Sequence, residues 1–365
     1  MEHPSIYLEP DWVNTIRTHA PDSERRGILG NEQLALIYEQ KWFKFLVPEA
    51  YSGLQIPLPR QVRLEEGLAW ANGSFGWVVT LCSGAGWFGG FMEAEFASKI
   101  FNDAKLCLAG SGAATGAAVI TGNGYVINGE WNYASGVHHA THITANCIIK
   151  QGDKTVLTNE GSPLILPFIV DRKDVSVIPA WKFVGMMGTG SDAYQIKNLA
   201  VDKEHCFNIN PKFPVVDAPL YHYPFLQLAE VTLAANLSGM AVHFTDLCSS
   251  IFAERIQRSA TSMLQKDKLT DILNEVETRI ANARTHFYTV VDRSWQVVID
   301  KSTLSEEAAH EVSVASRNLA KVSRESVDTL YPYCGLMAAN PETELNQVWR
   351  DIHTAGQHSL LTFDA

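Results

Sequence analysis

Residues 109–136 read AGSGAATGAAVITGNGYVINGEWNYASG, and this stretch decides the fold of the middle of the chain. It opens with a run of small residues, 110–118, that leaves backbone N–H groups uncovered, so a flat or anionic ligand can approach them closely. The Asn123-Gly124 pair that follows lies between apolar residues, which is a strong signal for a β-hairpin. The stretch therefore predicts a hairpin beside a backbone that a ligand can reach.

The second half of the stretch predicts a strand, a turn and a returning strand. Residues 125–127 are expected to form the strand, the Asn-Gly pair at 128–129 a second tight turn, and residues 131–135 the returning strand. Side chains alternate between the two faces of a strand. Three residues are thus expected to share one face: Trp131, Tyr133 and Ser135. An aromatic wall ending in a hydroxyl suits a planar heteroaromatic ring, although the core of an ordinary hairpin has the same pattern.

Composition indicates a globular protein with a large core. The chain has 365 residues, of which 46% are hydrophobic and 19% charged, so two or three domains and large buried interfaces are expected. The net charge of −11 argues against nucleic acid or an anionic membrane as the main partner.

Targeting and redox signals are those of a cytoplasmic protein. The first residues, MEHPSIYLEPDW, have no basic and then apolar pattern of a secretory signal, and the longest apolar run, near 163–170, is too short to span a bilayer. Six cysteines are scattered without CxxC spacing. They predict reduced, mostly buried thiols and neither a disulfide framework nor a zinc site.

The residue pattern divides the chain into three segments that differ in expected secondary structure. Residues 1–105 are expected to form an N-terminal helical domain, residues 106–215 a β domain, and residues 216–365 a C-terminal four-helix bundle. The N-terminal helices are predicted at 11–18, 23–44, 61–72 and 74–92, and the bundle helices at 225–259, 266–299, 305–330 and 342–361. Segment 74–92 is rich in glycine and aromatic residues, which indicates close helix packing or the wall of a pocket.

The β region is predicted to be an antiparallel barrel or sandwich. Strands and turns do not alternate with helices in 106–215, so a doubly wound sheet is not expected. The glycines at 110, 112 and 116 have the wrong spacing for the dinucleotide fingerprint, so nicotinamide binding has no support. The fold class is therefore mainly α with a central β domain.

Five motifs in this order resemble those of the acyl-CoA dehydrogenase-fold flavoproteins, and the resemblance covers nearly the whole chain. They are VPEAYSG at 47–53 (similar to VPExxGG), GYVINGE at 124–130 (similar to GxxxNGxK), VGMMGTGS at 184–191 (similar to GMRGT/S), Val201-Asp202 (similar to the V-P that follows) and WRDIHTA at 349–355 (similar to the RD motif of the last helix). The resemblance implies a flavin cofactor and homo-oligomers, either tetramers or dimers, with flavin sites near subunit borders.

The residues depart from the dehydrogenase branch of this fold. Where many dehydrogenases carry their catalytic glutamate, this chain has Gln357-His358. Glu230, on a bundle helix, is the alternative base. The family's Trp-x-Thr becomes Tyr133-Ala134-Ser135, and its Arg-x-x-Phe-Gly segment, which helps to hold the adenine end of FAD, has no match near 255–265.

The combination of Trp-x-x-x-Ser-Gly at 131–136 with Trp-Arg-Asp-Ile-His-x-Ala-x-x-His at 349–358 is similar to the two-component flavin-dependent monooxygenases. These take reduced flavin, FMN or FAD, from a separate flavin reductase and hydroxylate phenols or related small molecules through a C4a-hydroperoxyflavin. The resemblance implies that Ser135 lies near flavin N5 and that His358 lies near flavin and substrate, where a base with a pKa near neutrality activates a phenol. An acyl-CoA dehydrogenase or oxidase with a relocated base, and a non-catalytic flavin-binding relative, remain alternatives.

The site residues expected from these arguments form three groups. The catalytic candidates are His358 and Ser135; the flavin-binding candidates are Ser111, Tyr133, Ser135, Gly136, Gly188 and Thr189; the substrate-lining candidates are Trp77, Cys82, Trp87 and Phe91. Arg350 and Asp351 are expected to form a structural ion-pair site. The histidines at 138, 139 and 142 are interpreted as ordinary surface or interface residues and not as a metal site, because no carboxylate lies in their segment.

Overall fold

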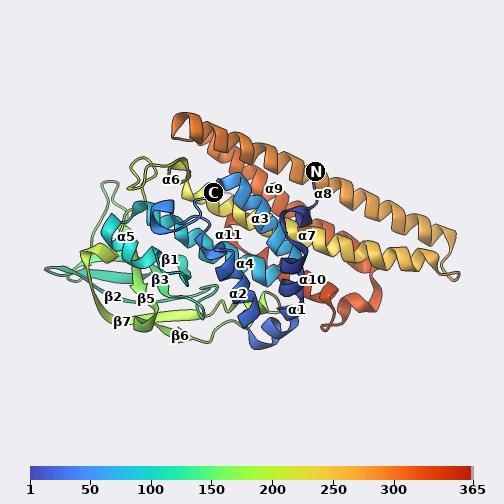
Figure 1. The fold of residues 1–365 in the computed structure, drawn as a ribbon, viewed down its shortest axis with the longest axis horizontal. Coiled ribbons are helices and arrows are strands. Elements are labelled where there is room, and N and C mark those ends of the chain that lie inside the picture. Colours follow the sequence, from blue (N-terminus) through green and yellow to red (C-terminus); the bar gives the residue numbers. More distant parts are fainter. Residues whose placement is uncertain (363–365) are drawn as a thin grey trace.

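The chain was analysed as a computed structural model that describes residues 1–362 (Figure 1). Helices come first: α1 (Pro10–Arg26), α2 (Asn31–Glu39), α3 (Leu58–Ala71), α4 (Gly73–Gly86) and α5 (Ala94–Phe101). After the sheet follow α6 (Pro219–His222), α7 (Phe225–Gln257), α8 (Met263–Lys301), α9 (Glu306–Leu330), α10 (Glu344–Ala355) and α11 (Ser359–Thr362). The predicted fold class is confirmed, whereas the predicted domain boundaries stay a prediction.

Glycines lie at two places where the helices differ from the prediction. The helix expected over 23–44 is divided, because Gly27 adopts a left-handed φ of 73° and ends α1. The last bundle helix, expected over 342–361, is interrupted at Gly356, which follows α10. Segment 74–92 forms α4 and then a 3-10 helix, η4 (Trp87–Phe91).

One mixed sheet forms the β region. Its strands are β1 (Leu108–Ile120), β2 (Gly124–Trp131), β3 (His142–Gln151), β4 (Lys154–Thr155), β5 (Ile165–Asp171), β6 (Ser176–Ile178) and β7 (Ala193–Asp202). The order is β4-β3-β1-β2-β7-β6, with β5 paired to β3. Each pair is antiparallel, as predicted, except β1 with β3, which is parallel. The hairpin brings the chain back to the edge where β1 began, so β3 enters on the other side of β1 in the same direction.

The predicted hairpin at Asn123-Gly124 is confirmed, but the second turn at 128–129 is wrong. β2 runs on through Asn128 and Gly129 with only a shift of register. The physical reason is packing: a Cβ on Gly129 would lie 2.6 Å from the Cα of Gly116 and 2.6 Å from the Trp131 ring. These glycines lie within strands, where the absence of a side chain allows close packing, and they do not form a turn.

The predicted returning strand at 131–135 is also wrong, because β2 ends at Trp131. Trp131 is fully buried and stacks on Tyr194 with ring centroids 5.1 Å apart. Tyr133 has a left-handed φ of 67° and is 63% exposed, whereas Ser135 is buried. The three side chains expected to share one face therefore point into different environments.

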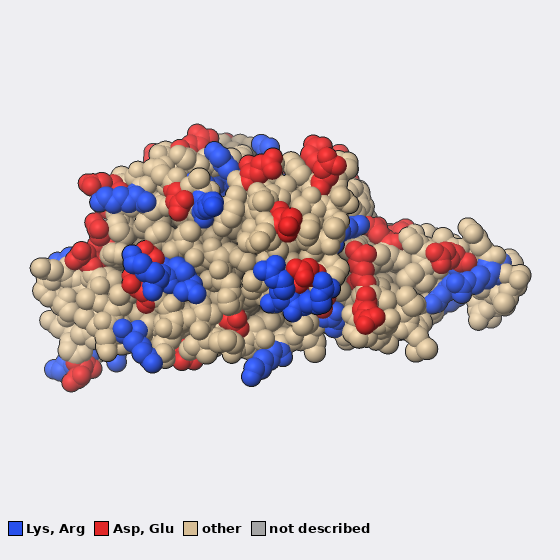
Figure 2. All heavy atoms as spheres, turned by 60° about the horizontal axis from the view of Figure 1, so that its bottom comes forward, with Lys and Arg blue, Asp and Glu red and all other residues tan. Residues whose placement is uncertain are grey.

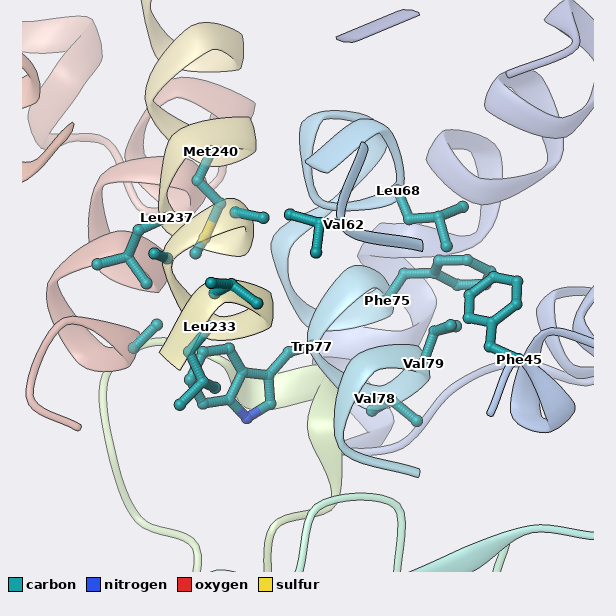
Figure 3. Packing of buried hydrophobic residues seen from close by; sticks show 14 of the residues in the cluster. Phe45, Val62, Leu68, Phe75, Trp77, Val78, Val79, Leu233, Leu237 and Met240 are labelled. Atoms are coloured by element: carbon teal, nitrogen blue, oxygen red, sulfur yellow. The ribbon is translucent and has the colours of Figure 1, made fainter. Parts of the chain in front are cut away.

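Helices from both ends of the chain share one hydrophobic core around α7, and the sheet has a second core. Figure 3 shows side chains of α3, α4 and α7 that belong to the first core, among them Val62, Trp77 and Leu233. Glycines bring these helices close: a Cβ on Gly76 would lie 2.6 Å from the backbone of Ala69. Close helix packing, one of the two interpretations of segment 74–92, is thus present.

The long helix α7 has the length and composition of a membrane span, but 83% of its most apolar window is buried within the protein. That burial is typical of the central helix of a bundle. On the face shown in Figure 2, acidic and basic side chains are interspersed, so this face carries no field of one sign.

Candidate flavin and substrate site

The helix α4 is where the candidate residues of the sheet and of the helices meet. It contacts β1 and the 3-10 helix η6 (Met187–Thr189) on the sheet side, and α7 and α10 on the bundle side. Cys82 of α4 contacts the loop after β2, where its thiol lies 3.6 Å from the Ser135 carbonyl oxygen. Gly136 has a left-handed φ of 75°, and a Cβ there would lie 2.5 Å from the Cys82 sulfur. Only glycine therefore permits this approach.

Ser135 begins a chain of buried hydroxyl groups. Its Oγ lies 2.8 Å from Ser191 Oγ, which lies 2.6 Å from Thr189 Oγ1, and Thr189 donates to the Met186 carbonyl at 2.7 Å. A carbonyl only accepts, so Thr189 must accept from Ser191 and Ser191 from Ser135. The hydroxyl proton of Ser135 is therefore donated to Ser191, and the Ser135 oxygen remains available to accept a hydrogen bond.

The RD motif of α10 holds the loop that leads to this chain. The Arg350 guanidinium donates to the Val184 carbonyl at 2.6 Å, and the Met186 N–H donates to the Asp351 carboxyl. Burial raises the pKa of Asp351 to about 7, against a smaller lowering by the Met186 hydrogen bond. Arg350 pairs with Glu24 at 2.6 Å. The expected structural role is confirmed, although the two residues bind the loop and not each other.

His358 lies beside Trp77 of α4, with ring centroids 6.2 Å apart. Its Nδ1 accepts a hydrogen bond of 3.3 Å from the Leu360 N–H. Burial lowers its pKa, so the ring is neutral at pH 7. Ser135 and His358 do not touch; each contacts a different face of α4, at Cys82 and at Trp77.

An aromatic group borders the Ser135 loop on its exposed side. Tyr133, Trp181 and Phe183 lie within 6.3 Å of one another by ring centroids. Asp192 ties these segments together, because its carboxylate accepts from the N–H groups of Ala180 and Trp181 and from His138 at 2.8 Å. The sequence argument missed Ser191 and Asp192, although Ser191 ends the quoted GMMGTGS motif.

The remaining candidates lie in three different settings. Ser111 is half-buried on β1, beside a stretch in which the pairing with β3 shifts register and leaves 112–115 uncovered. Gly188 packs against α1 and α4, where a Cβ would lie 3.2 Å from Ser74. Trp87 and Phe91 belong to an aromatic cluster with Phe225. Their place in a substrate pocket stays a prediction.

Glu230, the alternative base of a dehydrogenase, is engaged elsewhere. It is 1% exposed and accepts hydrogen bonds from Ser313 and Arg317 of α9. Burial raises its pKa. A carboxylate tied in this way to the opposite helix is a structural group of the bundle.

Among residues 1–362, no group of three His, Cys, Asp or Glu side chains lies close enough to hold a metal ion. His138 bonds Asp192, and burial lowers the pKa of His139 to about 4.

Comparison with known proteins shows what the chain is similar to. The model of the family described as acyl-CoA dehydrogenase, C-terminal domain, matches residues 231–363. Flavin-dependent monooxygenase, oxygenase subunit HsaA, of Rhodococcus jostii is 25% identical over 94% of this chain and 91% of that protein. The chain is an acyl-CoA dehydrogenase-fold relative of the flavin-dependent monooxygenases. Indole-3-acetate monooxygenase of Pseudomonas putida is also 25% identical, over 87% of this chain and 80% of that protein.

Solved structures show the same fold. The 3-HSA hydroxylase from Rhodococcus sp. RHA1 superimposes with a TM-score of 0.89 at 21% identity, over 96% of this chain and 92% of that one. XiaF from Streptomyces sp., in complex with FADH2 and glycerol, gives a TM-score of 0.85 at 19% identity, over 96% and 89%. The predicted acyl-CoA dehydrogenase-like architecture is confirmed.

Proposed function

We propose that this protein is the oxygenase component of a two-component flavin-dependent monooxygenase, acting on a small aromatic or otherwise electron-rich molecule. The observation that carries the proposal is the hydroxyl chain. A reduced flavin has an N–H at N5, and the Ser135 oxygen, whose own proton is donated to Ser191, is an acceptor for it. Relatives of the whole chain that are named as monooxygenases support the same conclusion.

The residues around Ser135 fit a flavin ring. The backbone at 112–115 is uncovered, so N–H groups can reach the polar edge of the ring, and the aromatic side chains of Tyr133 and Trp181 offer flat surfaces. When bound, reduced flavin supplies the electrons that activate dioxygen. His358, neutral and beside Trp77, would contact the substrate hydroxyl and move its proton.

The form and the source of the flavin are part of the proposal. The segment around 255–265 lacks the adenine-binding motif, and the Arg255 side chain is engaged with the carbonyls of Tyr333 and Cys334. A loosely held reduced FMN or FAD, delivered by a separate reductase to a cytoplasmic homo-oligomer, agrees with this. The Glu230 contacts argue against the dehydrogenase alternative.

The test is to bind FMNH2 and FADH2 to the purified protein without oxygen and then to mix with oxygenated buffer and a panel of phenols. We expect reduced flavin to bind, a delay before the oxidised-flavin absorbance returns, and ¹⁸O from labelled dioxygen in the product. Ser135→Ala should shorten the delay and raise the yield of hydrogen peroxide. Ser294→Ala removes a buried hydroxyl that bonds Tyr223 at 2.9 Å and serves as the control.

Reoxidation as fast as that of free flavin, with no labelled product for any phenol, would contradict the proposed monooxygenase function. Bleaching of bound oxidised FAD by an acyl-CoA would support the dehydrogenase instead. Flavin binding without either reaction would leave a non-catalytic relative.

A further inference from the structure

A second group of polar side chains lies buried between α3, α4 and α7, away from the hydroxyl chain. Gln61 and Glu65 of α3, Thr80 of α4 and Asn236 of α7 form its centre, and each is at most 3% exposed. Gln61 donates to Glu65 Oε1 at 2.9 Å, and Asn236 donates to Thr80 Oγ1 at 2.8 Å. The Ser83 hydroxyl lies 3.4 Å from Glu65 Oε1 and 3.2 Å from the Thr80 carbonyl oxygen, which makes the group continuous.

Three polar atoms of this group have no partner among residues 1–362. They are Gln61 Oε1, Glu65 Oε2 and Asn236 Oδ1. The orientation of the Asn236 amide follows from its other bond, because its nitrogen donates to the Thr232 carbonyl at 2.9 Å and a carbonyl only accepts. Buried polar atoms that lack a partner cost roughly 1–3 kcal/mol each, so three within one hydrogen-bonded group point to a partner that these residues do not supply.

The protonation state of Glu65 determines which hydrogen-bond donors and acceptors a matching ligand must have. Burial raises the pKa of Glu65 to about 8, against a smaller lowering by hydrogen bonds from Gln61, Ser83 and Thr80. At neutral pH the carboxyl is therefore protonated, and since Oε1 accepts from Gln61 the proton is placed on Oε2. The group then presents one unused donor, Glu65 Oε2–H, and two unused acceptors, the amide oxygens of Gln61 and Asn236.

A hydroxyl group donates one hydrogen bond and accepts one, so it can pair with Glu65 Oε2–H and with one of the two amide oxygens. A carboxylate would face the two acceptors, and an ammonium would find no charged partner. We propose that Glu65 and Asn236 form a subsite that binds a hydroxyl group of the substrate, remote from the carbon that reacts.

The position of α4 connects this subsite with the candidate active site. Residues three, four and seven apart share one face of a helix, which places Trp77, Thr80 and Gly84 together. Trp77 contacts His358, and a Cβ built on Gly84 meets nothing within 4 Å, so that face borders open space. Figure 3 shows Trp77 and Leu233 between α4 and α7. Asn236 follows Leu233 by about one turn of α7. The substrate class, which rests on the proposed function, is a diol or phenol with a second hydroxyl at its far end.

The test is a binding measurement without flavin or oxygen, by calorimetry, on a matched pair of probes. 2,6-Dihydroxynaphthalene and 6-methyl-2-naphthol have the same size and differ only in one hydroxyl. We expect the diol to bind roughly 5- to 100-fold more tightly, because the methyl group leaves buried polar atoms unpaired. The preference should vanish in Asn236→Leu and persist in Gln227→Leu, which changes an amide of the same helix that bonds Ser313.

Infrared difference spectra give a second readout. The carbonyl band of protonated Glu65 should shift when the diol binds, should stay in place with the methyl analogue, and should be absent in Glu65→Gln. Equal affinities for the two probes would show that the cluster holds water only, and would overturn the subsite. So would failure of both to bind, or a preference that survives in Asn236→Leu.

The subsite and the proposed function fail separately. Labelled product from small phenols without discrimination between the probes would overturn the subsite alone. Discrimination between the probes by a protein that does not react with reduced flavin and oxygen would overturn the proposed function alone.

Discussion

Two consecutive glutamates of α3, both 0% exposed, are held in opposite ways. Glu66 accepts from Arg284 at 2.7 and 2.8 Å, from Tyr288 at 2.7 Å and from Ser238, so each carboxylate oxygen has two donors. Glu65 has no charged partner among residues 1–362 and leaves one oxygen unbonded. The first arrangement completes an ion pair that joins α3, α7 and α8. The second leaves a neutral acid with capacity for a ligand.

The largest expected effect on stability distinguishes two single variants, in which glutamine replaces either Glu66 or Glu65. Glu66→Gln leaves the Arg284 charge buried without its counter-ion, and we expect it to lower the free energy of unfolding by about 3–5 kcal/mol. Glu65→Gln replaces a group that is neutral in the folded protein. At pH 5, where ionisation of this group stabilises the unfolded chain only slightly, we expect a change below about 1 kcal/mol. Urea unfolding at pH 5 measures both. Equal losses for the two variants would remove the contrast between them.

The second prediction varies pH. The folded state holds the Glu65 proton up to about pH 8, whereas the unfolded chain releases it near 4.5. Between these values the folded state binds more protons, so this group makes stability fall as pH rises, and the fall is complete above pH 8. Unfolding free energies of the wild type minus those of Glu65→Gln should decline from pH 5 to pH 9 by an amount on the order of a few kcal/mol.

Since all other titrating groups are common to both proteins, the difference isolates Glu65. Tyr288→Phe, which removes one of the Glu66 donors, serves as the control and should shift stability by a similar amount at each pH. A difference that rises with pH would mean that Glu65 is ionised in the folded protein.

The third prediction asks whether the hydroxyl chain at Ser135 behaves like the saturated network of Glu66. Ser191→Ala deprives the Ser135 proton of its acceptor while Thr189 keeps its bond to Met186. We expect a loss of about 1–2 kcal/mol in unfolding free energy, because one buried donor is left unpaired. With its proton freed, Ser135 becomes a donor toward the flavin, and the ratio of hydrogen peroxide to product should rise. Ser191→Thr keeps a hydroxyl and should restore the ratio.

Much of the fold was accessible from the sequence because five ordered motifs and helical periodicity act locally. The hairpin at Asn123-Gly124, the long helices of the bundle and a structural rather than catalytic role for Arg350 and Asp351 all followed from them. What escaped depends on contacts between distant segments. The parallel pairing of β1 with β3 and the burial of Trp131 against Tyr194 have no local signal.

The candidate site shows the same limit. Ser135 and His358 came from motif resemblance, but the direction of the hydroxyl chain depends on Ser191, 56 residues away. In the same way, the Glu65-Glu66 pair looks uniform in the sequence. The difference comes from Arg284, which lies 218 residues after Glu66 and pairs with Glu66 but not with Glu65.

The last prediction extends the comparison to His358, a half-buried base that has no charged partner among residues 1–362. Burial favours the neutral form of either group, so it raises the pKa of an acid and lowers that of a base. The product-forming rate should therefore be nearly constant from pH 8 to pH 6.5 and should fall only below that, as the ring gains a proton and can no longer accept one from the substrate. Single-turnover hydroxylation across pH measures this limb, with His358→Asn as the variant that should lack it. A limb above pH 6.5 would show that a carboxylate stabilises the protonated ring, and His358 would then resemble the paired Glu66 and not Glu65.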